Sequence, residues 1–281
     1  MQFTRHKPLF TIILVLAIAT LALTLILWSG FRPASQPLPD FTQIERVDDL
    51  KSSFFDFLTP IVVSENARVG EQRKRLLDII ASNTDGKTLS RSDRKWIVRL
   101  ATEYELEWPK ALPEATLDEL KQRVDVVPVE LALAQAAKES GWGRSRFAQA
   151  GNNLFGHWCY VPGCGLEPSR RNQNAIHEVE AFDSVRESVR RYINNLNTHD
   201  AYASLRQTRR AERDAGRVPS ALALADELSF YSERREAYVE DIKQMIRFNR
   251  GLIEDALSSP DSSNELSNDA INSSGSVSSS E

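Results

Sequence analysis

One acidic side chain stands out by its place in the chain. Glu139 lies in the segment AAKESGWG (136–143). On a helix, Ala132, Ala136 and Glu139 fall on one stripe, so another backbone or a ligand can approach the acid closely. Partial burial and the negative end of the helix dipole both disfavour the charged form and are expected to raise its pKa. A carboxyl group that keeps its proton near neutral pH can act as a general acid. A solvated glutamate at a helix end is the other interpretation.

The residues after this acid suit a site for a sugar. Gly141 can take the left-handed conformation that ends a helix. Trp142 offers a flat apolar face, against which the C–H surface of a sugar ring can stack. Asn152 and Asn153 supply amide donors and acceptors for hydroxyl groups. Taken singly, Trp142 and Phe155 are equally compatible with packing in the core.

These motifs carry a resemblance to a known family. The pattern A-x-A-A-x-E-S-G-W-G-x-S-x-x-A, followed by N-N-L-F-G, resembles the glucosaminidase family of peptidoglycan hydrolases, glycoside hydrolase family 73. The segments FDSVRESVRRYINNLNTHDAY (182–202) and SSFFDFLTPIV (52–62) are similar to its Bax-type branch. The resemblance covers roughly residues 49–252. It implies a lysozyme-like fold and hydrolysis of the β-1,4 bond after N-acetylglucosamine in peptidoglycan.

The same resemblance implies roles for individual residues. Glu139 matches the catalytic acid that protonates the leaving oxygen. The other matched positions are Asn153, Phe155 and Gly156 in the segment that lines the cleft, and Tyr202 and Tyr231 in the second half of the fold. Together with Trp142 and Asn152, these residues are the candidates for substrate binding.

The second carboxylate of a glycosidase is harder to place. Such enzymes usually use two acids, and the family carries the second one on a hairpin. Glu167, Glu178 and Glu180 all fall in that region. We favour Glu178, just before a capped helix, although Glu167 lies nearer the matching hairpin distance. The acetamido group of the substrate could also replace a second carboxylate.

Two cysteines flank a turn in the same region. Cys159 and Cys164 enclose Pro162-Gly163, and in an oxidising compartment such a pair is expected to form a local disulfide. A zinc site with His157 is an alternative, although it falls short of four ligands. Two free thiols are the third possibility. We expect no metal and no cofactor.

A long apolar stretch precedes all of these motifs. Residues 9–28 carry no charge, and at about 1.5 Å per residue they could span a bilayer of about 30 Å. Arg5 and Lys7 favour a cytoplasmic segment at 1–8. A cleaved signal peptide is the alternative, without a convincing cleavage site. We therefore expect a single-pass inner-membrane protein whose catalytic domain lies in the periplasm, after a linker at 29–45.

The rest of the chain predicts a mainly α, α+β protein. A helical segment is expected at 46–108, the catalytic domain with a short β-hairpin lobe at 109–254, and a disordered Ser-rich tail at 255–281. Apolar spacing and caps predict helices at 47–58, around 69–80, at 96–104 with Ser92 as cap, from Pro128 to Glu139, from Ser184 to Leu196, at 221–228 and at 238–253.

Charge and partners complete the prediction. The net charge of −4 argues against nucleic acid, because phosphate binding needs clustered positive charge. We expect peptidoglycan glycan strands as the substrate and the inner membrane as the anchor. Two other interpretations stay open: a lytic transglycosylase or muramidase of the same fold, and a non-catalytic glycan-binding module of the cell wall.

Overall fold

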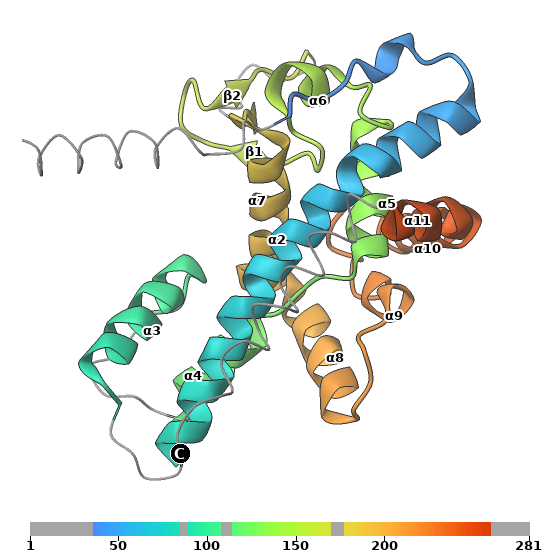
Figure 1. Ribbon diagram of the computed structural model, residues 1–281. Coiled ribbons are helices and arrows are strands. Elements are labelled where there is room, and N and C mark those ends of the chain that lie inside the picture. The colour runs from blue at the N-terminus through green and yellow to red at the C-terminus, as the bar shows by residue number, and fades with distance from the viewer. Residues whose placement is uncertain (1–35, 85–88, 108–113, 170–176, 260–281) are drawn as a thin grey trace, which may run out of the picture. The chain divides into compact units, whose positions relative to one another are not determined.

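The computed structural model describes residues 36–84, 89–107, 114–169 and 177–259 (Figure 1). Of the described residues, all except Gln36 belong to one compact unit, Pro37–Glu281. Among the described residues, no helix is both long enough and apolar enough to cross a membrane. The apolar stretch at 9–28, the segment at 1–8, residues 29–35 of the linker and residues 260–281 of the tail lie outside the described residues.

One long helix runs through the unit. α2 (Val47–Thr84) has 38 residues, so the prediction of two separate helices in this region is wrong. The helix continues through Pro60, although proline removes one backbone hydrogen bond at a cost of about 3 kcal/mol. Phe54, Phe55 and Leu58 before the proline and Val62 after it are fully buried. Burial on both sides of Pro60 offsets its cost.

The remaining helices differ in their ends from the prediction. They are η1 (Phe41–Gln43), α3 (Arg91–Glu103), α4 (Glu114–Arg123), α5 (Val129–Ser140), α6 (Arg146–Gly151), α7 (Val185–Thr198), η2 (Asp200–Tyr202), α8 (Ala203–Asp214), α9 (Ala221–Ala225), α10 (Glu236–Phe248) and α11 (Arg250–Ser258). The prediction did not include η1, α4, α6, η2 or α8. Ser90, not Ser92, caps α3, because its hydroxyl accepts from the Asp93 N–H. The predicted last helix is two helices that meet at Asn249, whose amide donates to the Met245 carbonyl.

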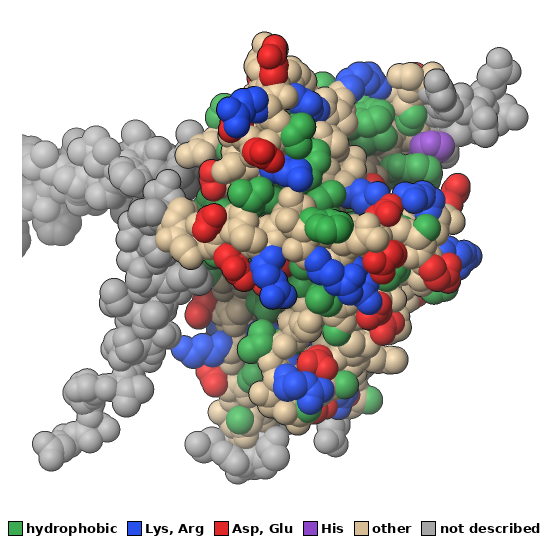
Figure 2. All heavy atoms as spheres, turned by 90° about the vertical axis from the view of Figure 1, so that its right-hand side faces the viewer, with side chains coloured by type: hydrophobic (Ala, Val, Ile, Leu, Met, Phe, Trp, Pro, Cys, Tyr) green, Lys and Arg blue, Asp and Glu red, His purple; other side chains and the backbone are tan. Residues whose placement is uncertain are grey.

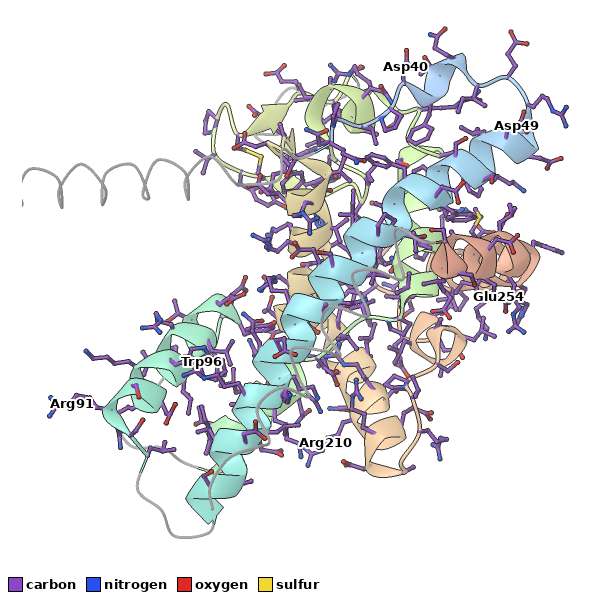
Figure 3. All side chains as sticks on the ribbon, viewed as in Figure 1. Asp40, Asp49, Arg91, Trp96, Arg210 and Glu254 are labelled. Atoms are coloured by element: carbon purple, nitrogen blue, oxygen red, sulfur yellow. A yellow bond between two sulfur atoms is a disulfide. The ribbon has the colours of Figure 1, made fainter. Side chains whose placement is uncertain are left out.

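The helices form two hydrophobic clusters along α2. The larger one surrounds α5 with residues of α2, α7, α9, α10 and α11. The smaller one joins the C-terminal half of α2 to α3 and α4. On its edge, the Arg75 guanidinium lies 4.4 Å from the centre of the Trp96 ring of α3 (Figure 3). α2 is therefore part of both clusters.

A small antiparallel sheet follows α6. It consists of β1 (Trp158–Cys159), β2 (Gly165–Leu166) and β3 (Glu178–Glu180), in the order β1-β3-β2. The register pairs Cys159 with Glu178 and Gly165 with Glu180. The predicted short β lobe is thus present, with β3 as its central strand. The protein is mainly α with one small sheet.

A buried carboxylate ties α2 to α7. Glu65 is 2% exposed, and its oxygens accept from Arg190 at 2.9 Å and from Arg68 at 3.0 Å. Burial works to raise the pKa of Glu65, but the two guanidinium groups outweigh it and lower the pKa. The ion pairs fix α7, which carries Tyr192 into the site described below.

The surface mixes both signs of charge. On the face shown in Figure 2, Lys and Arg side chains are interspersed with Asp and Glu. This face offers no block of positive charge of the kind that phosphate backbones require.

Candidate active site

The acid that the sequence singles out ends a buried helix. α5 begins at Val129, with Pro128 as its N-cap residue, whereas the sequence predicted Pro128 as the first helical residue. Ala132 and Ala136 are fully buried on the predicted stripe. Gly141 has φ +59°, the left-handed conformation that was expected to end the helix. Glu139 lies in the last turn, where the alanines of its own stripe are packed into the core.

The environment of Glu139 favours its neutral form. The side chain is half-buried, and burial raises its pKa, as the sequence predicts. The Tyr238 hydroxyl donates a hydrogen bond to the carboxylate, and the charge of Lys138 adds to this; both effects lower the pKa without cancelling the effect of burial. Lys138 also pairs with Asp241, at 2.8 Å. The result is a carboxyl group suited to hold a proton and to release it.

Four tyrosines, from three helices and the loop before α10, lie near this acid. The Glu139 charge raises the pKa of each, in addition to the larger effect of burial; they are Tyr192 of α7, Tyr202 of η2, Tyr231 before α10 and Tyr238 of α10. The structure thus brings the predicted Tyr202 and Tyr231 together with Glu139, with 6.1 Å between the two ring centres. Tyr231 and Tyr238 stack in parallel at 5.5 Å.

Tyr192, Tyr238 and Gln135 were not predicted as site residues. Tyr192 and Tyr238 occupy apolar helix positions, where a tyrosine is indistinguishable from a core residue. Gln135 carried a usable signal, since it is one polar residue inside the otherwise apolar run from Leu131 to Ala137. A fully buried amide needs partners, and its partners here are tyrosines of the site.

The segment after α6 forms one side of the site. Asn153 is 2% exposed, and its amide donates to the His157 and Glu180 carbonyls at 2.9 and 2.8 Å. Asn152, with φ +51°, donates to the Phe182 carbonyl. These amides donate hydrogen bonds to backbone carbonyl groups around the turn, and they therefore fix the conformation of the segment. Their predicted contact with substrate stays a prediction.

Phe155 and Gly156 bring this segment to the acid. The Phe155 ring is buried and stacks on Tyr192 at 4.0 Å, and its carbonyl accepts from the Tyr231 hydroxyl at 3.0 Å. Gly156 is exposed, with φ +71°. A Cβ atom at this position would lie 3.9 Å from Glu139 Oε2, with no other heavy atom outside its chain neighbours within 4 Å. Space next to the carboxyl group is therefore left open here.

Trp142 lies in an aromatic cluster with α2. Its ring packs edge-on against Phe54 at 5.7 Å and Phe55 at 5.4 Å, and the Lys51 ammonium group lies 5.6 Å from its centre. These contacts give Trp142 a packing role that joins α5 to α2. Its predicted role as a sugar platform stays a prediction.

The hairpin acids differ in their contacts. Glu178 is 7% exposed, and its oxygens accept from the backbone N–H groups of Gly163 at 3.0 Å and Gly165 at 2.8 Å. Glu180 is partly exposed and lies 3.6 Å from Arg191. Glu167 is exposed, and its carbonyl accepts from Arg146. Glu178 therefore holds the turn between β1 and β2, whichever acid acts on the substrate.

The same turn is closed by the predicted disulfide. Cys159 and Cys164 are bonded to each other, with their Cα atoms 6.3 Å apart. The two sulfur atoms lie near the Glu178 carboxylate in an arrangement that could suggest a metal site. Because the sulfur atoms are joined, they are not thiolate ligands, and the zinc and free-thiol alternatives are set aside.

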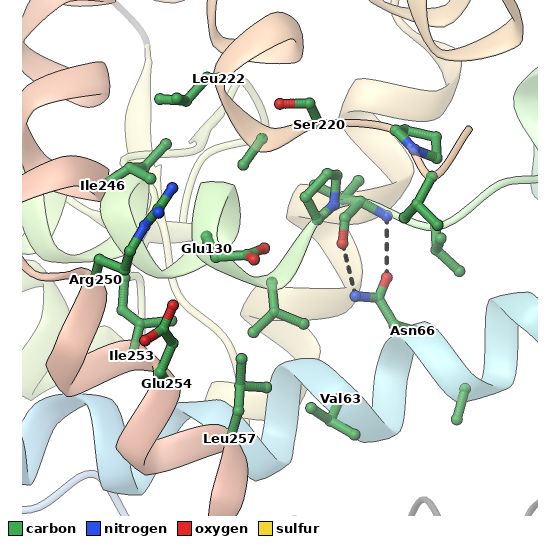
Figure 4. Close-up of a pocket in the computed structure, with 18 of the residues that line it drawn as sticks. Val63, Asn66, Glu130, Ser220, Leu222, Ile246, Arg250, Ile253, Glu254 and Leu257 are labelled. Carbon is green, nitrogen blue, oxygen red and sulfur yellow. Dashed lines mark hydrogen bonds between the residues drawn. The ribbon is translucent and has the colours of Figure 1, made fainter. Parts of the chain in front are cut away.

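A large pocket lies elsewhere. It has a volume of about 800 Å³ and is bordered by α2, the start of α5, and α9 to α11 (Figure 4). On its wall, the Asn66 amide exchanges two hydrogen bonds with the Val127 backbone. Glu130 lines the pocket at the first turn of α5, about 14 Å along the helix axis from Glu139. The pocket is therefore separate from the acid.

Comparison with known proteins agrees with this site. A family model described as glucosaminidase, mannosyl-glycoprotein endo-beta-N-acetylglucosaminidase, matches residues 114–250. Protein bax of Escherichia coli (strain K12) is 32% identical over 219 residues, which make up 78% of this chain and 77% of that protein. The chain belongs to the glucosaminidase family, in its Bax-type branch. Among solved structures, none matches it.

The glucosaminidase family to which this chain belongs is a family of peptidoglycan hydrolases. The residues matched by the family model contain Glu139 and all four tyrosines around it. α2 and α3 lie before the matched range, yet α2 packs directly on α5. The glucosaminidase segment therefore shares its core with a helix that the family model does not cover.

Proposed function

We propose that the protein is an endo-β-N-acetylglucosaminidase, which hydrolyses the β-1,4 bond after N-acetylglucosamine in peptidoglycan with Glu139 as general acid. The environment of Glu139 is the observation that carries this proposal. Burial raises its pKa, four tyrosines surround it, and the missing side chain of Gly156 leaves space beside Oε2. The family supports the class of reaction, and the motif around Glu139 supports the choice of acid.

In this mechanism, Glu139 transfers its proton to the glycosidic oxygen while the bond from that oxygen to the anomeric carbon breaks. Water adds to the anomeric carbon as a hydroxyl group, and the proton that it loses returns to the enzyme. The positive charge that develops on the sugar needs a partner, which is either a carboxylate of the hairpin or the acetamido group of the substrate.

For the hairpin carboxylate we propose Glu178, with Glu180 and Glu167 as the alternatives. β3 holds Glu178 rigidly, which supports precise placement. Its contacts also set a requirement: to act on the sugar, Glu178 has to release the N–H of Gly163 or Gly165. Glu180 accepts from neither of these two N–H groups of the turn, and its ion pair with Arg191 is partly exposed.

We also propose that residues 9–28 anchor the protein in the inner membrane, with the catalytic domain in the periplasm. The uncharged stretch after Arg5 and Lys7 supports this arrangement. The bond between Cys159 and Cys164 supports an oxidising compartment for the domain.

One experiment tests the proposed reaction. Purified sacculi are digested with the full-length protein, and the soluble fragments are identified by mass spectrometry. We expect new reducing ends on N-acetylglucosamine. Anhydro-muramic ends would instead indicate a lytic transglycosylase, and reducing muramic ends a muramidase. Binding to sacculi without any new ends would indicate a glycan-binding module.

A further inference from the structure

A buried amide lies one helical turn before the proposed acid. Gln135 and Glu139 are four residues apart on α5 and therefore lie on the same side of that helix. Gln135 is fully buried, in a helix that is otherwise apolar at its buried positions except for Ser140. Such an amide is costly unless its oxygen and nitrogen find partners. Its partners connect it to Glu139.

A chain of polar side chains, joined by two hydrogen bonds, leads from Tyr192 to the neighbour of Glu139. The Tyr192 hydroxyl lies 2.6 Å from Gln135 Oε1, and Gln135 Nε2 lies 2.9 Å from the Tyr238 hydroxyl. The Tyr238 hydroxyl lies next to the Glu139 carboxyl group and lowers its pKa as a hydrogen-bond donor. The chain joins α7, α5 and α10 through side chains that are all buried except for the partly exposed Glu139.

The chemistry of these groups gives the chain a direction. An ionised carboxylate only accepts hydrogen bonds, so the Tyr238 hydroxyl has to donate to Glu139. The Tyr238 oxygen then accepts from Gln135 Nε2, and this leaves Gln135 Oε1 to accept from Tyr192. A hydroxyl can rotate and reverse its role, whereas an amide has one donor end and one acceptor end. Gln135 therefore holds the direction in which the Tyr238 hydrogen points.

We infer that Tyr192 and Gln135 act through Tyr238 to position the proton of Glu139 on the carboxyl oxygen that faces the substrate. This inference rests on the proposed role of Glu139 as general acid. Because Tyr238 donates to one carboxyl oxygen, the acid proton is held on the other oxygen. When that proton leaves for the glycosidic oxygen, the Tyr238 bond becomes charge-assisted and stronger. The hydrogen-bond chain therefore stabilises the ionised Glu139 that forms as the glycosidic bond breaks.

Several charged and titratable groups lie near Glu139 and can influence its protonation. Those that face it are Lys138 on its own helix, and Tyr192, Tyr202, Tyr231 and Tyr238 on the packed elements. Burial raises the pKa of Tyr202 to about 12, and those of the other three tyrosines are also raised. All four stay neutral while Glu139 titrates, so none of them adds a charge beside it.

The two tyrosines also have packing contacts, which a test has to leave in place. The Tyr192 ring stacks on Phe155 at 4.0 Å, and the Tyr238 ring stacks on Tyr231 at 5.5 Å. Substitution by phenylalanine keeps each ring and removes only the hydroxyl group. Tyr104 supplies a matched control, because it is 2% exposed and its hydroxyl donates to Gln72 at 2.9 Å in the other hydrophobic cluster.

The experiment compares Tyr238→Phe, Tyr192→Phe, the double variant and Tyr104→Phe in the full chain. Turnover of glycan strands is measured against pH, and the Glu139 carboxyl carbon is titrated by ¹³C NMR. Tyr238→Phe is expected to lower kcat about 10- to 100-fold with little change in KM, because the acid is misplaced. It also raises the pKa of Glu139, since a bond to the charged form is lost.

Tyr192→Phe is expected to change kcat and the Glu139 titration in the same direction by a smaller factor. The double variant is expected to match Tyr238→Phe alone, because Tyr192 acts through Tyr238. Tyr104→Phe keeps the wild-type kcat and titration. The inference is overturned if Tyr238→Phe behaves like Tyr104→Phe, or if the effects of Tyr192→Phe and Tyr238→Phe multiply.

The NMR titration separates this inference from the proposed function. If the wild-type protein cleaves no glycan, the reaction class is wrong. The hydrogen-bond chain is then still supported by a Glu139 pKa that rises in Tyr238→Phe and rises no further in the double variant. An unchanged titration in Tyr238→Phe rejects the chain whether or not the protein is active.

Discussion

Gly156 lies against Glu139, so that a Cβ atom on residue 156 would stand 3.9 Å from the Glu139 Oε2 atom. Two requirements meet at this glycine. Its backbone has φ +71°, which side chains rarely adopt, and its missing side chain keeps the carboxyl oxygen accessible.

Gly156→Ala is therefore expected to reduce both stability and activity. The left-handed backbone costs about 1–2 kcal/mol for a residue with a Cβ atom. The added methyl group occupies the space beside Oε2, and we expect kcat to fall about 10- to 100-fold. Gly216→Ala is the control, because Gly216 also has φ +71° but no heavy atom near its Cβ position. Equal activity losses in both variants would refute a specific role of Gly156.

Glu139→Gln is expected to abolish most of the activity without loss of stability. The amide keeps the shape but has no acidic proton, and general acid catalysis contributes about 10²–10⁴-fold. At neutral pH the buried carboxylate carries a cost that the neutral amide avoids, so the thermal midpoint should not fall. Glu130→Gln, at the other end of α5, should keep its activity. Near-normal turnover of Glu139→Gln would show that the acid lies elsewhere.

The pH dependence of the reaction follows from the raised pKa of Glu139. Its protonated form is the active one, so the rate declines as the pH rises through a pKa above the usual 4.5. Lys138 lowers this pKa, and Lys138→Met is therefore expected to move the basic limb of kcat/KM to higher pH. Lys243→Met breaks the pair between this α10 residue and Asp226, at the end of α9, and serves as the control. A limb that moves to lower pH in Lys138→Met would contradict the assignment of that limb to Glu139.

The disulfide is expected to stabilise the turn that Glu178 holds. In the chain-entropy model, a bridge across so short a loop contributes about 2 kcal/mol. Replacing both Cys159 and Cys164 by serine should speed hydrogen exchange at the Gly163 and Gly165 amides. Intact-mass measurement confirms the bridge if reduction adds the mass of two hydrogen atoms. Unchanged exchange rates after the double substitution would mean that Glu178 alone keeps the turn in place.

The hairpin acids are separated by three alanine variants. Glu178→Ala is expected to lose much of the rate with little change in glycan binding, whereas Glu167→Ala is mild. Because Glu178 also holds Gly163 and Gly165, exchange at these amides has to be measured together with the rate. A rate loss confined to Glu180→Ala would transfer the role to Glu180. Full activity in all three variants would favour the acetamido group of the substrate.

The sequence predicts those features that depend on neighbours along the chain. Ser184 caps α7 as expected, since its hydroxyl accepts a hydrogen bond from the Glu187 N–H. The Glu187 carboxylate accepts from the backbone N–H of Asp183, and not from that of Ser184. Gly141 ends α5, and the two cysteines close their short loop. In each case, the residues that make the contact lie within five positions of one another.

Features that depend on distant contacts were missed. The sequence predicts a helix that ends at residue 58, but α2 continues through Pro60 because it is buried on both sides of the proline. The chain from Tyr192 through Gln135 to Tyr238 joins residues that are 57 and 103 positions apart. Periodicity assigns these tyrosines to apolar faces, and only the fold shows that their hydroxyl groups bind the same Gln135 amide.

The packing of α2 also bears on how the chain folds. This helix comes early in the chain, yet one of its main partners is α11, near the end of the described residues. Contacts between such distant segments raise the contact order, which slows folding. During synthesis, α2 has to wait with an uncovered apolar face until α11 has emerged. The protein is therefore most exposed to aggregation and to proteases before α11 is complete. Cutting the chain to residues 114–250 would remove α2 and most of α11 from the core around Glu139.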